Sequence, residues 1–123
     1  MSDDAPRSPQ ELFDGFPEGL AIFRRVQQAV SAIGEASVAV TRSQVTFRRR
    51  KAFAFVWRPG QYVSSGVPAV LSIAMPHEVT SNRFKEIAHP TPTVWMHHLE
   101  LRDVSAVDDQ VCGWLANAHE NAR

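Results

Sequence analysis

Two long stretches of the chain repeat their apolar residues every three or four positions, which is the period of an α-helix with one buried face. They span residues 17–34 and residues 105 to about 121. The apolar positions are Leu20, Phe23, Val26, Val30 and Ile33 in the first, and Val107, Val111, Trp114, Leu115 and Ala118 in the second. A short helix is predicted to precede them, from a capping pattern at Ser8 to about Phe16.

Between these helices the apolar period changes to two, which is typical of β-strands. Strands are predicted around Val38 and Val40, and over residues 45–49, 53–57, 69–75 and 94–101. Pro59-Gly60 and the run at 64–66 are turn or loop signals. Residues 76–93 are predicted to form a long connection, with one helical turn around residues 83–87.

Helices, then a run of strands, then a helix predict an α+β fold. We expect a single antiparallel, mostly meandering sheet of about five strands, with two long helices (N- and C-terminal) packed on one face. Residues 1–7 are expected to form a flexible N-terminal arm, and residues 8–123 a single domain large enough to bury a core.

Alternation along each strand predicts which side chains face the helices. Those expected to face the helices are Val45, Phe47, Phe53, Phe55, Trp57, Trp95, His97, Leu99 and Leu101. Those expected to face away are Thr46, Ala54, Val56, Met96 and Arg102, together with Arg48, Arg50, Arg58, His98 and Glu100. Small residues such as Ala39, Ser72 and Ala74 would form the floor between them.

Composition narrows the classes of protein that the chain can belong to. Its 123 residues carry 13 basic and 13 acidic side chains, so the formal net charge of +0 argues against a protein that is basic overall and built to bind nucleic acid. One cysteine, Cys112, and the absence of a signal-peptide pattern predict a cytoplasmic location. No apolar run is long enough to span a bilayer, so no membrane association is expected.

The charges are unevenly distributed along the chain. No acidic residue occurs between Glu35 and Glu78, whereas Arg42, Arg48, Arg49, Arg50, Lys51 and Arg58 all fall there. We therefore predict a local positive field and a candidate ligand-binding surface formed by Arg48, Arg50, Arg58, His98 and Glu100. Guanidinium groups present a planar fork to phosphate or carboxylate, so the ligand would be an anionic small molecule or an acidic partner. The alternative is a solvated face that carries arginines for solubility.

Other chemistries have less support in the sequence. His97 and His98 are adjacent and would face opposite sides of a strand, and no histidine has a partner at metal-ligand spacing, so no metal is expected. His98 and Glu100 share a strand face and could act as a general-base pair or form a surface hydrogen bond. No nucleophile motif, phosphate loop or dinucleotide fingerprint occurs, so neither catalytic residues nor a cofactor is assigned.

Three segments together resemble a known family: residues 43–50, residues 53–60, and Trp95-Met96-His97-His98-Leu99-Glu100-Leu101. The family consists of small bacterial domains catalogued as domain of unknown function 5655, and the resemblance runs from Ser8 to the last helix. Lys85-Glu86 and Pro90 also match, which implies that the long connection is ordered. The resemblance implies an accessory or binding role and carries no catalytic residue.

Four functional hypotheses follow. The leading one is a non-enzymatic binding or interaction module that uses the basic sheet face. The others are a nucleic-acid-associated accessory domain, a small enzyme that uses His98 and Glu100, and a structural homodimer joined through the open face of the sheet.

Overall fold

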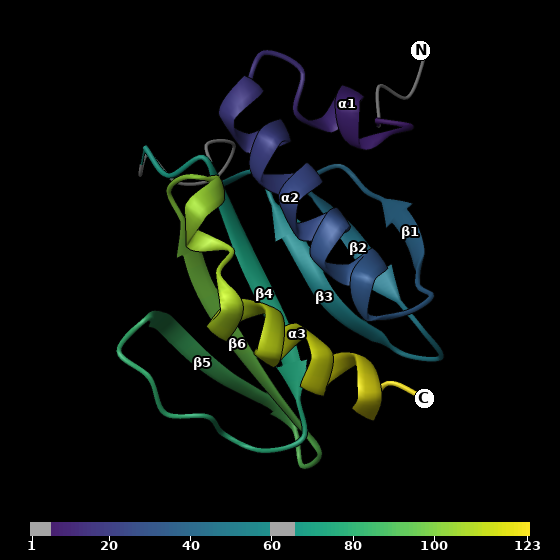
Figure 1. Ribbon diagram of the computed structural model, residues 1–123, viewed down its shortest axis with the longest axis vertical. Coiled ribbons are helices and arrows are strands. Elements are labelled where there is room, and N and C mark those ends of the chain that lie inside the picture. The colour runs from purple at the N-terminus through teal and green to yellow at the C-terminus, as the bar shows by residue number, and fades with distance from the viewer. Residues whose placement is uncertain (1–5, 60–65) are drawn as a thin grey trace.

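The computed structural model describes residues 6–59 and 66–123 (Figure 1). The helices are α1 (Pro9–Leu12), α2 (Pro17–Ile33), the 3-10 turn η2 (Val104–Ala106) and α3 (Asp109–Asn121). The predicted cap is present, because the Ser8 hydroxyl accepts from the Glu11 N–H at 3.2 Å. Most of the expected N-terminal arm and part of the expected loop after Pro59 lie outside the described residues.

Within the described residues the sheet contains six strands rather than about five. They are β1 (Ser37–Val40), β2 (Gln44–Arg48), β3 (Ala52–Trp57), β4 (Ala69–Met75), β5 (Phe84–Thr91) and β6 (Val94–Leu101). All neighbours are antiparallel, and their order is β1-β2-β3-β4-β6-β5. The sheet is therefore a meander up to β4, after which β5 lies at the far edge and β6 returns to the middle.

The helical turn predicted around residues 83–87 was wrong, because this segment begins β5. The strand escaped sequence analysis because its alternation is weak: of its side chains only Phe84 is buried, and register shifts follow Phe84 and Ala88 in its pairing with β6. The predicted start of the last helix was also early. Residues 104–106 form the 3-10 turn, and α3 begins after Asp108, whose carboxylate accepts from the Val111 N–H at 3.1 Å.

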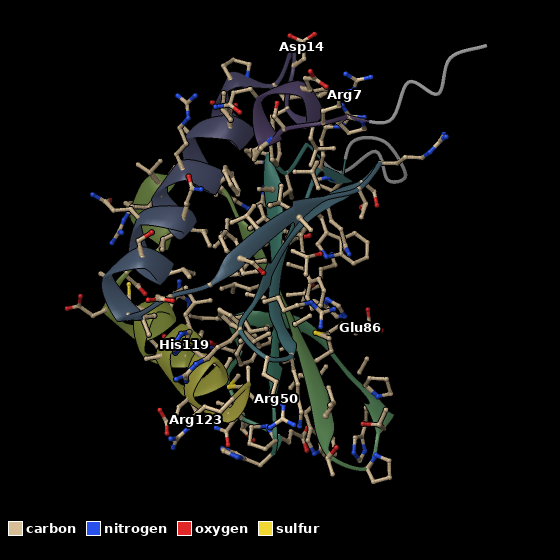
Figure 2. The ribbon with its side chains drawn as sticks, turned by 90° about the vertical axis from the view of Figure 1, so that its right-hand side faces the viewer. Arg7, Asp14, Arg50, Glu86, His119 and Arg123 are labelled. Atoms are coloured by element: carbon tan, nitrogen blue, oxygen red, sulfur yellow. The ribbon has the colours of Figure 1, made fainter. Side chains whose placement is uncertain are left out.

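Both long helices lie on one face of the sheet, as expected, and no described helix covers the other face (Figure 2). The core fills the space between the helices and the sheet. Its largest fully buried side chains include Phe13, Phe23, Phe47, Phe53, Ile22, Leu71, Ile73, Leu101 and Leu115. One face of the sheet is therefore covered by the helices. We call the opposite face, which no described helix covers, the open face.

A β-bulge in β3 reverses part of the predicted register. Phe47 pairs with Ala54 and Arg48 with Ala52, so Phe53 is the extra residue. A bulge of this kind turns two consecutive side chains to one side, and Phe53 and Ala54 are indeed both buried. From Ala54 onward the alternation is shifted by one: Val56 faces the helices, whereas Phe55 and Trp57, which we expected there, lie on the open face opposite Ser72 and Val70.

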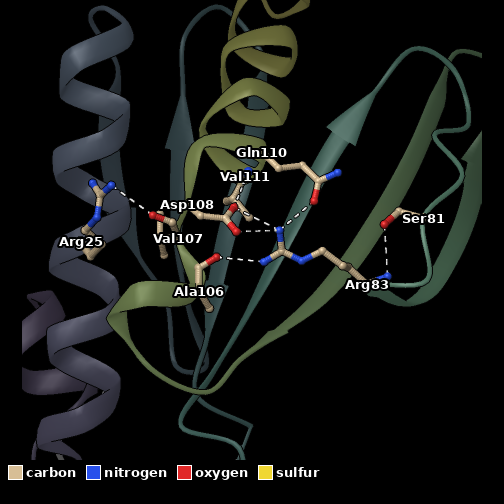
Figure 3. Close-up of polar contacts among 8 residues, drawn as sticks. All are labelled: Arg25, Ser81, Arg83, Ala106, Val107, Asp108, Gln110 and Val111. Atoms are coloured by element: carbon tan, nitrogen blue, oxygen red, sulfur yellow. Dashed lines mark hydrogen bonds and ion pairs between the residues drawn. The ribbon is translucent and has the colours of Figure 1, made fainter.

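The connection from β4 to β5 is held against the start of α3 by Arg83 (Figure 3). Its guanidinium donates to Asp108 at 3.1 Å, to Gln110 at 2.9 Å and to the carbonyl oxygen of Ala106 at 3.0 Å. The Val111 N–H and the Arg83 guanidinium lower the pKa of the Asp108 carboxyl. Arg83 therefore links this connection to the start of α3.

Candidate functional site

The five residues of the predicted binding surface do not gather in one place. Arg48 is exposed at the end of β2, and Arg50 is exposed in the turn that follows. That turn is fastened to the end of α3, because the N–H groups of Arg50 and Lys51 both donate to the Ala122 carbonyl oxygen, at 2.9 and 3.0 Å. These two arginines therefore lie at one end of the sheet, away from the middle of the open face.

A large, open hollow of about 1260 Å³ lies beside Arg48, between the ends of α2 and α3. Its lining brings Arg48 and Arg49 together with Glu35, Glu120 and His119. Arg49 donates to the His119 carbonyl oxygen at 3.1 Å, so its charge already meets the negative end of the α3 dipole. Because carboxylates and two helix C-termini share the hollow, it is poorly suited to an anion.

Arg58 faces the helices, which corrects its predicted position on the open face. Its guanidinium donates to the Leu12 carbonyl oxygen at 2.8 Å and lies over the Phe16 ring, 4.8 Å from the centroid. The shift in alternation caused by the bulge accounts for this, since Arg58 shares the parity of Val56. Arg58 thus joins α1 to the end of β3.

His98 and Glu100 do lie on the open face, at a groove that follows the middle of the sheet. Two adjoining hollows of about 270 and 170 Å³ share Trp57 and His98. We call them together the Trp57–His98 groove. Its apolar surface comes from Phe55, Trp57, Pro59, Val70 and Met96. Their combined space falls in the lower part of the range for small-molecule sites, about 300–1000 Å³.

Hydrogen bonding holds the His98 ring in place at the floor of the groove. The Ser72 hydroxyl on β4 lies 2.6 Å from Nδ1 of His98, its direct neighbour across the strands. The ring meets the Trp57 indole edge-on, with centroids 6.2 Å apart and an interplanar angle of 88°. The Trp57 Nε1–H is buried and has no acceptor among the described residues. A buried donor without an acceptor lowers the stability of the fold, so stability alone does not account for a tryptophan at this position.

Charged side chains form the rim of the groove on the β5 side. Glu100 is paired with Lys85 at 3.3 Å and with Arg102 at 3.2 Å. Glu86 lies directly across from His98 in the register, and Figure 2 shows it on the side away from the helices. His98 and Glu100 therefore each have another partner: Ser72 holds the histidine, and two cations hold the carboxylate.

His97, on the opposite side of the same strand, has a structural role. It is fully buried; its Nε2 accepts from the Val79 N–H at 2.9 Å, and its Nδ1 lies 3.0 Å from the Trp95 carbonyl oxygen. The hydrogen therefore resides on Nδ1, and desolvation lowers the pKa of the ring. His97 faces the helices, as the alternation predicted, and both of its ring nitrogens have hydrogen-bond partners. Among residues 6–59 and 66–123, no three His, Cys, Asp or Glu side chains are grouped closely enough to hold a metal ion.

Sequence reasoning missed most of the groove. Phe55 and Trp57 were expected to face the helices, and Lys85 and Glu86 were placed in the long connection. The sequence does carry one signal for the groove: β3 is apolar on both faces, so apolar side chains must also lie on the face away from the helices. Alternation alone cannot tell which of the two faces is buried. Only a paired partner strand resolves that ambiguity.

Comparison with known families gives one match. The model of the domain of unknown function DUF5655 matches residues 11–122, nearly the whole chain. The chain belongs to this family. No curated protein and no solved structure matches it significantly. None of the helices in the described part of this DUF5655 protein is both long and apolar enough to cross a membrane.

Proposed function

We propose that the protein is a non-enzymatic binding module that holds a small, flat, largely apolar molecule in the Trp57–His98 groove. The observation that carries this proposal is the groove itself: an aromatic hollow with a fixed histidine on the sheet face that no described helix covers. A sheet face that only meets water would carry alternating polar residues, whereas this one presents Phe55, Trp57, Val70 and Met96.

The polar groups around the groove define the chemistry of the ligand. Lys85 and Arg102 both pair with Glu100, and Glu86 adds a second carboxylate beside His98, so the rim charges balance. A neutral molecule fits this balance better than an anion does, because Arg48, Arg50 and Arg58 lie elsewhere. We therefore expect a planar ring system whose faces lie on Trp57 and whose N–H or amino group reaches Glu86 or His98.

Binding has more support than catalysis at this site. A His98–Glu100 general-base pair would need the carboxylate to orient the imidazole. Instead Ser72 orients His98, and Glu100 is engaged by Lys85 and Arg102. We accordingly assign Ser72 as the positioning residue of His98 and assign no catalytic residue.

Heteronuclear NMR of the ¹⁵N-labelled protein tests the proposal directly. Indole, quinoline and adenine serve as flat ring probes, and inorganic phosphate and citrate as anionic probes. We expect the ring probes to shift the Trp57 indole N–H signal and the amides of Ser72 and His98. The Trp57→Ala variant should lose the response, and the Arg50→Ala variant should keep it.

Two outcomes would contradict the proposal. One is that no ring probe shifts these signals at any concentration used. The other is that the anionic probes give the larger shifts and that these centre on Arg48 and Arg50. Thermal unfolding gives an independent measure, because a ligand at a hundred times its Kd adds about 2.7 kcal/mol to the free energy of unfolding.

A further inference from the structure

The two edges of the sheet differ in how they meet other strands. The β5 edge contains Pro90, which has no N–H, and it is interrupted by two register shifts against β6. Such features prevent another strand from pairing there. The β1 edge, Ser37–Val40, has no proline and no charged side chain, and it pairs with β2 over all four residues without a shift.

The hydrogen bonding of the first hairpin defines which backbone groups of β1 reach the free edge. The Thr41 N–H donates to the Gln44 carbonyl oxygen at 2.9 Å, so this pair belongs to the bonded set. In an antiparallel ladder bonded and non-bonded pairs alternate. Ser37 and Ala39 therefore direct their backbone groups toward β2. Val38 and Val40 direct theirs outward, where no described strand accepts them.

The same edge carries an exposed apolar side chain. Val38 leaves 41% of its surface exposed, whereas the other two large apolar residues with comparable exposure in the described chain, Phe16 and Val104, lie outside the strands. Unpaired backbone groups and an exposed valine thus coincide at one position.

We propose that this edge joins two copies of the chain, with β1 pairing antiparallel to β1 of the second copy. A two-fold axis across such an edge runs perpendicular to the sheet, so opposing residues must face the same side. A register that places Val38 opposite Val38 of the second copy satisfies this condition. In it the outward N–H and C=O groups of both Val38 residues form hydrogen bonds across the axis. Each Val38 then covers the other, and Ser37 faces Ala39 of the second copy.

A second copy of the chain fits this edge because its own β1 supplies both the matching backbone groups and an apolar side chain opposite Val38. An unrelated peptide would have to bring its own apolar residue to Val38, whereas the two-fold register brings one automatically. The pairing leaves both Trp57–His98 grooves on the same face of one continuous sheet. Four residues supply few hydrogen bonds, so the association should depend on concentration.

Cysteine cross-linking tests the register in a Cys112→Ser background. Opposing bonded residues have Cα atoms about 5.5 Å apart, which falls within the range for a disulfide. Val38→Cys should form a cross-linked dimer within minutes of mild oxidation. Ala39→Cys, which faces Ser37 of the second copy, should not. Cross-linking of Ala39→Cys in preference to Val38→Cys would overturn the proposal.

Sedimentation velocity tests the association without cross-linking, over protein concentrations from about 1 μM to about 1 mM. The wild-type mass should rise from 13.7 kDa toward twice that value. Val38→Lys should remain monomeric, because it opposes two like charges at the axis, while Thr91→Lys on the β5 edge should behave as the wild type. A wild type that stays monomeric throughout, or a Val38→Lys variant that still dimerises, would refute the β1 interface.

Discussion

Replacement of His97 is the sharpest test of how the sheet and the long β4–β5 connection are held together. The side chain is fully buried and lies 4.8 Å, between ring centroids, from Phe84 at the start of β5. It accepts from the Val79 N–H in the connection, and it donates to the Trp95 carbonyl oxygen in its own strand. One imidazole therefore ties three segments to the core.

The expected loss of stability has two parts. Truncation to alanine removes a side chain of roughly leucine size from a filled core, and such changes cost about 2–5 kcal/mol. It also leaves the Val79 N–H without its acceptor, which costs about 1–3 kcal/mol for a buried group and less here because Val79 is half-buried. We expect His97→Ala to lower the free energy of unfolding by about 3–5 kcal/mol, a large share of the roughly 5–15 kcal/mol that small domains possess.

Urea unfolding followed by circular dichroism measures this change, with His97→Leu and His77→Ala as companions. The leucine fills the space without accepting the hydrogen bond, so its cost should lie between those of the wild type and the alanine variant. His77 is exposed in the same connection, and its replacement should change stability by less than about 0.5 kcal/mol. A His97→Ala loss below about 1 kcal/mol would refute the role assigned to this histidine.

Two further predictions follow from burial. Burial lowers the pKa of His97, so below its ordinary pKa of 6.5 the unfolded chain binds a proton that the folded chain does not. The free energy of unfolding should therefore be highest above pH 6.5 and fall as the pH drops, by up to about 1.36 kcal/mol per pH unit from this group. Urea titrations at several pH values should show a shallower fall for His97→Leu. The bulge predicts that Ala54→Asp, at a position with no exposed surface, destabilises far more than Phe55→Asp on the open face; equal urea midpoints, or the reverse order, would contradict the register.

The long helices and five of the six strands in the described residues could be predicted from local pattern, because their signals do not depend on neighbours. The stripe from Leu20 to Ile33 has the helical period, and Val45 and Phe47 alternate with polar residues. β5 could not be found in this way. It is an edge strand stabilised by pairing with β6 and by burial of Phe84, so its evidence lies in another part of the chain.

The candidate site was predicted in part, and a single residue explains much of the rest. His98 and Glu100 were correctly assigned to the open face because β6 alternates clearly between buried and half-buried positions. In β3 every side chain is apolar, so the pattern fits two orientations of the strand, with either set of alternate side chains facing the helices. The extra residue at Phe53 determines which set does so, and it places Trp57 in the groove and Arg58 beside α1.

The basic cluster illustrates why residues close in sequence need not form one surface. Arg48 ends a strand, Arg49 reaches the last carbonyl groups of α3, and Arg50 lies in a turn bound to Ala122. Of these three side chains, Arg49 places its positive charge at the C-terminal end of α3, where cations are favourable. The open face is left nearly neutral and rich in aromatic surface. Because the opposite face buries the core, substitutions in the groove can alter binding with little loss of stability, which makes the proposed function separable from folding by experiment.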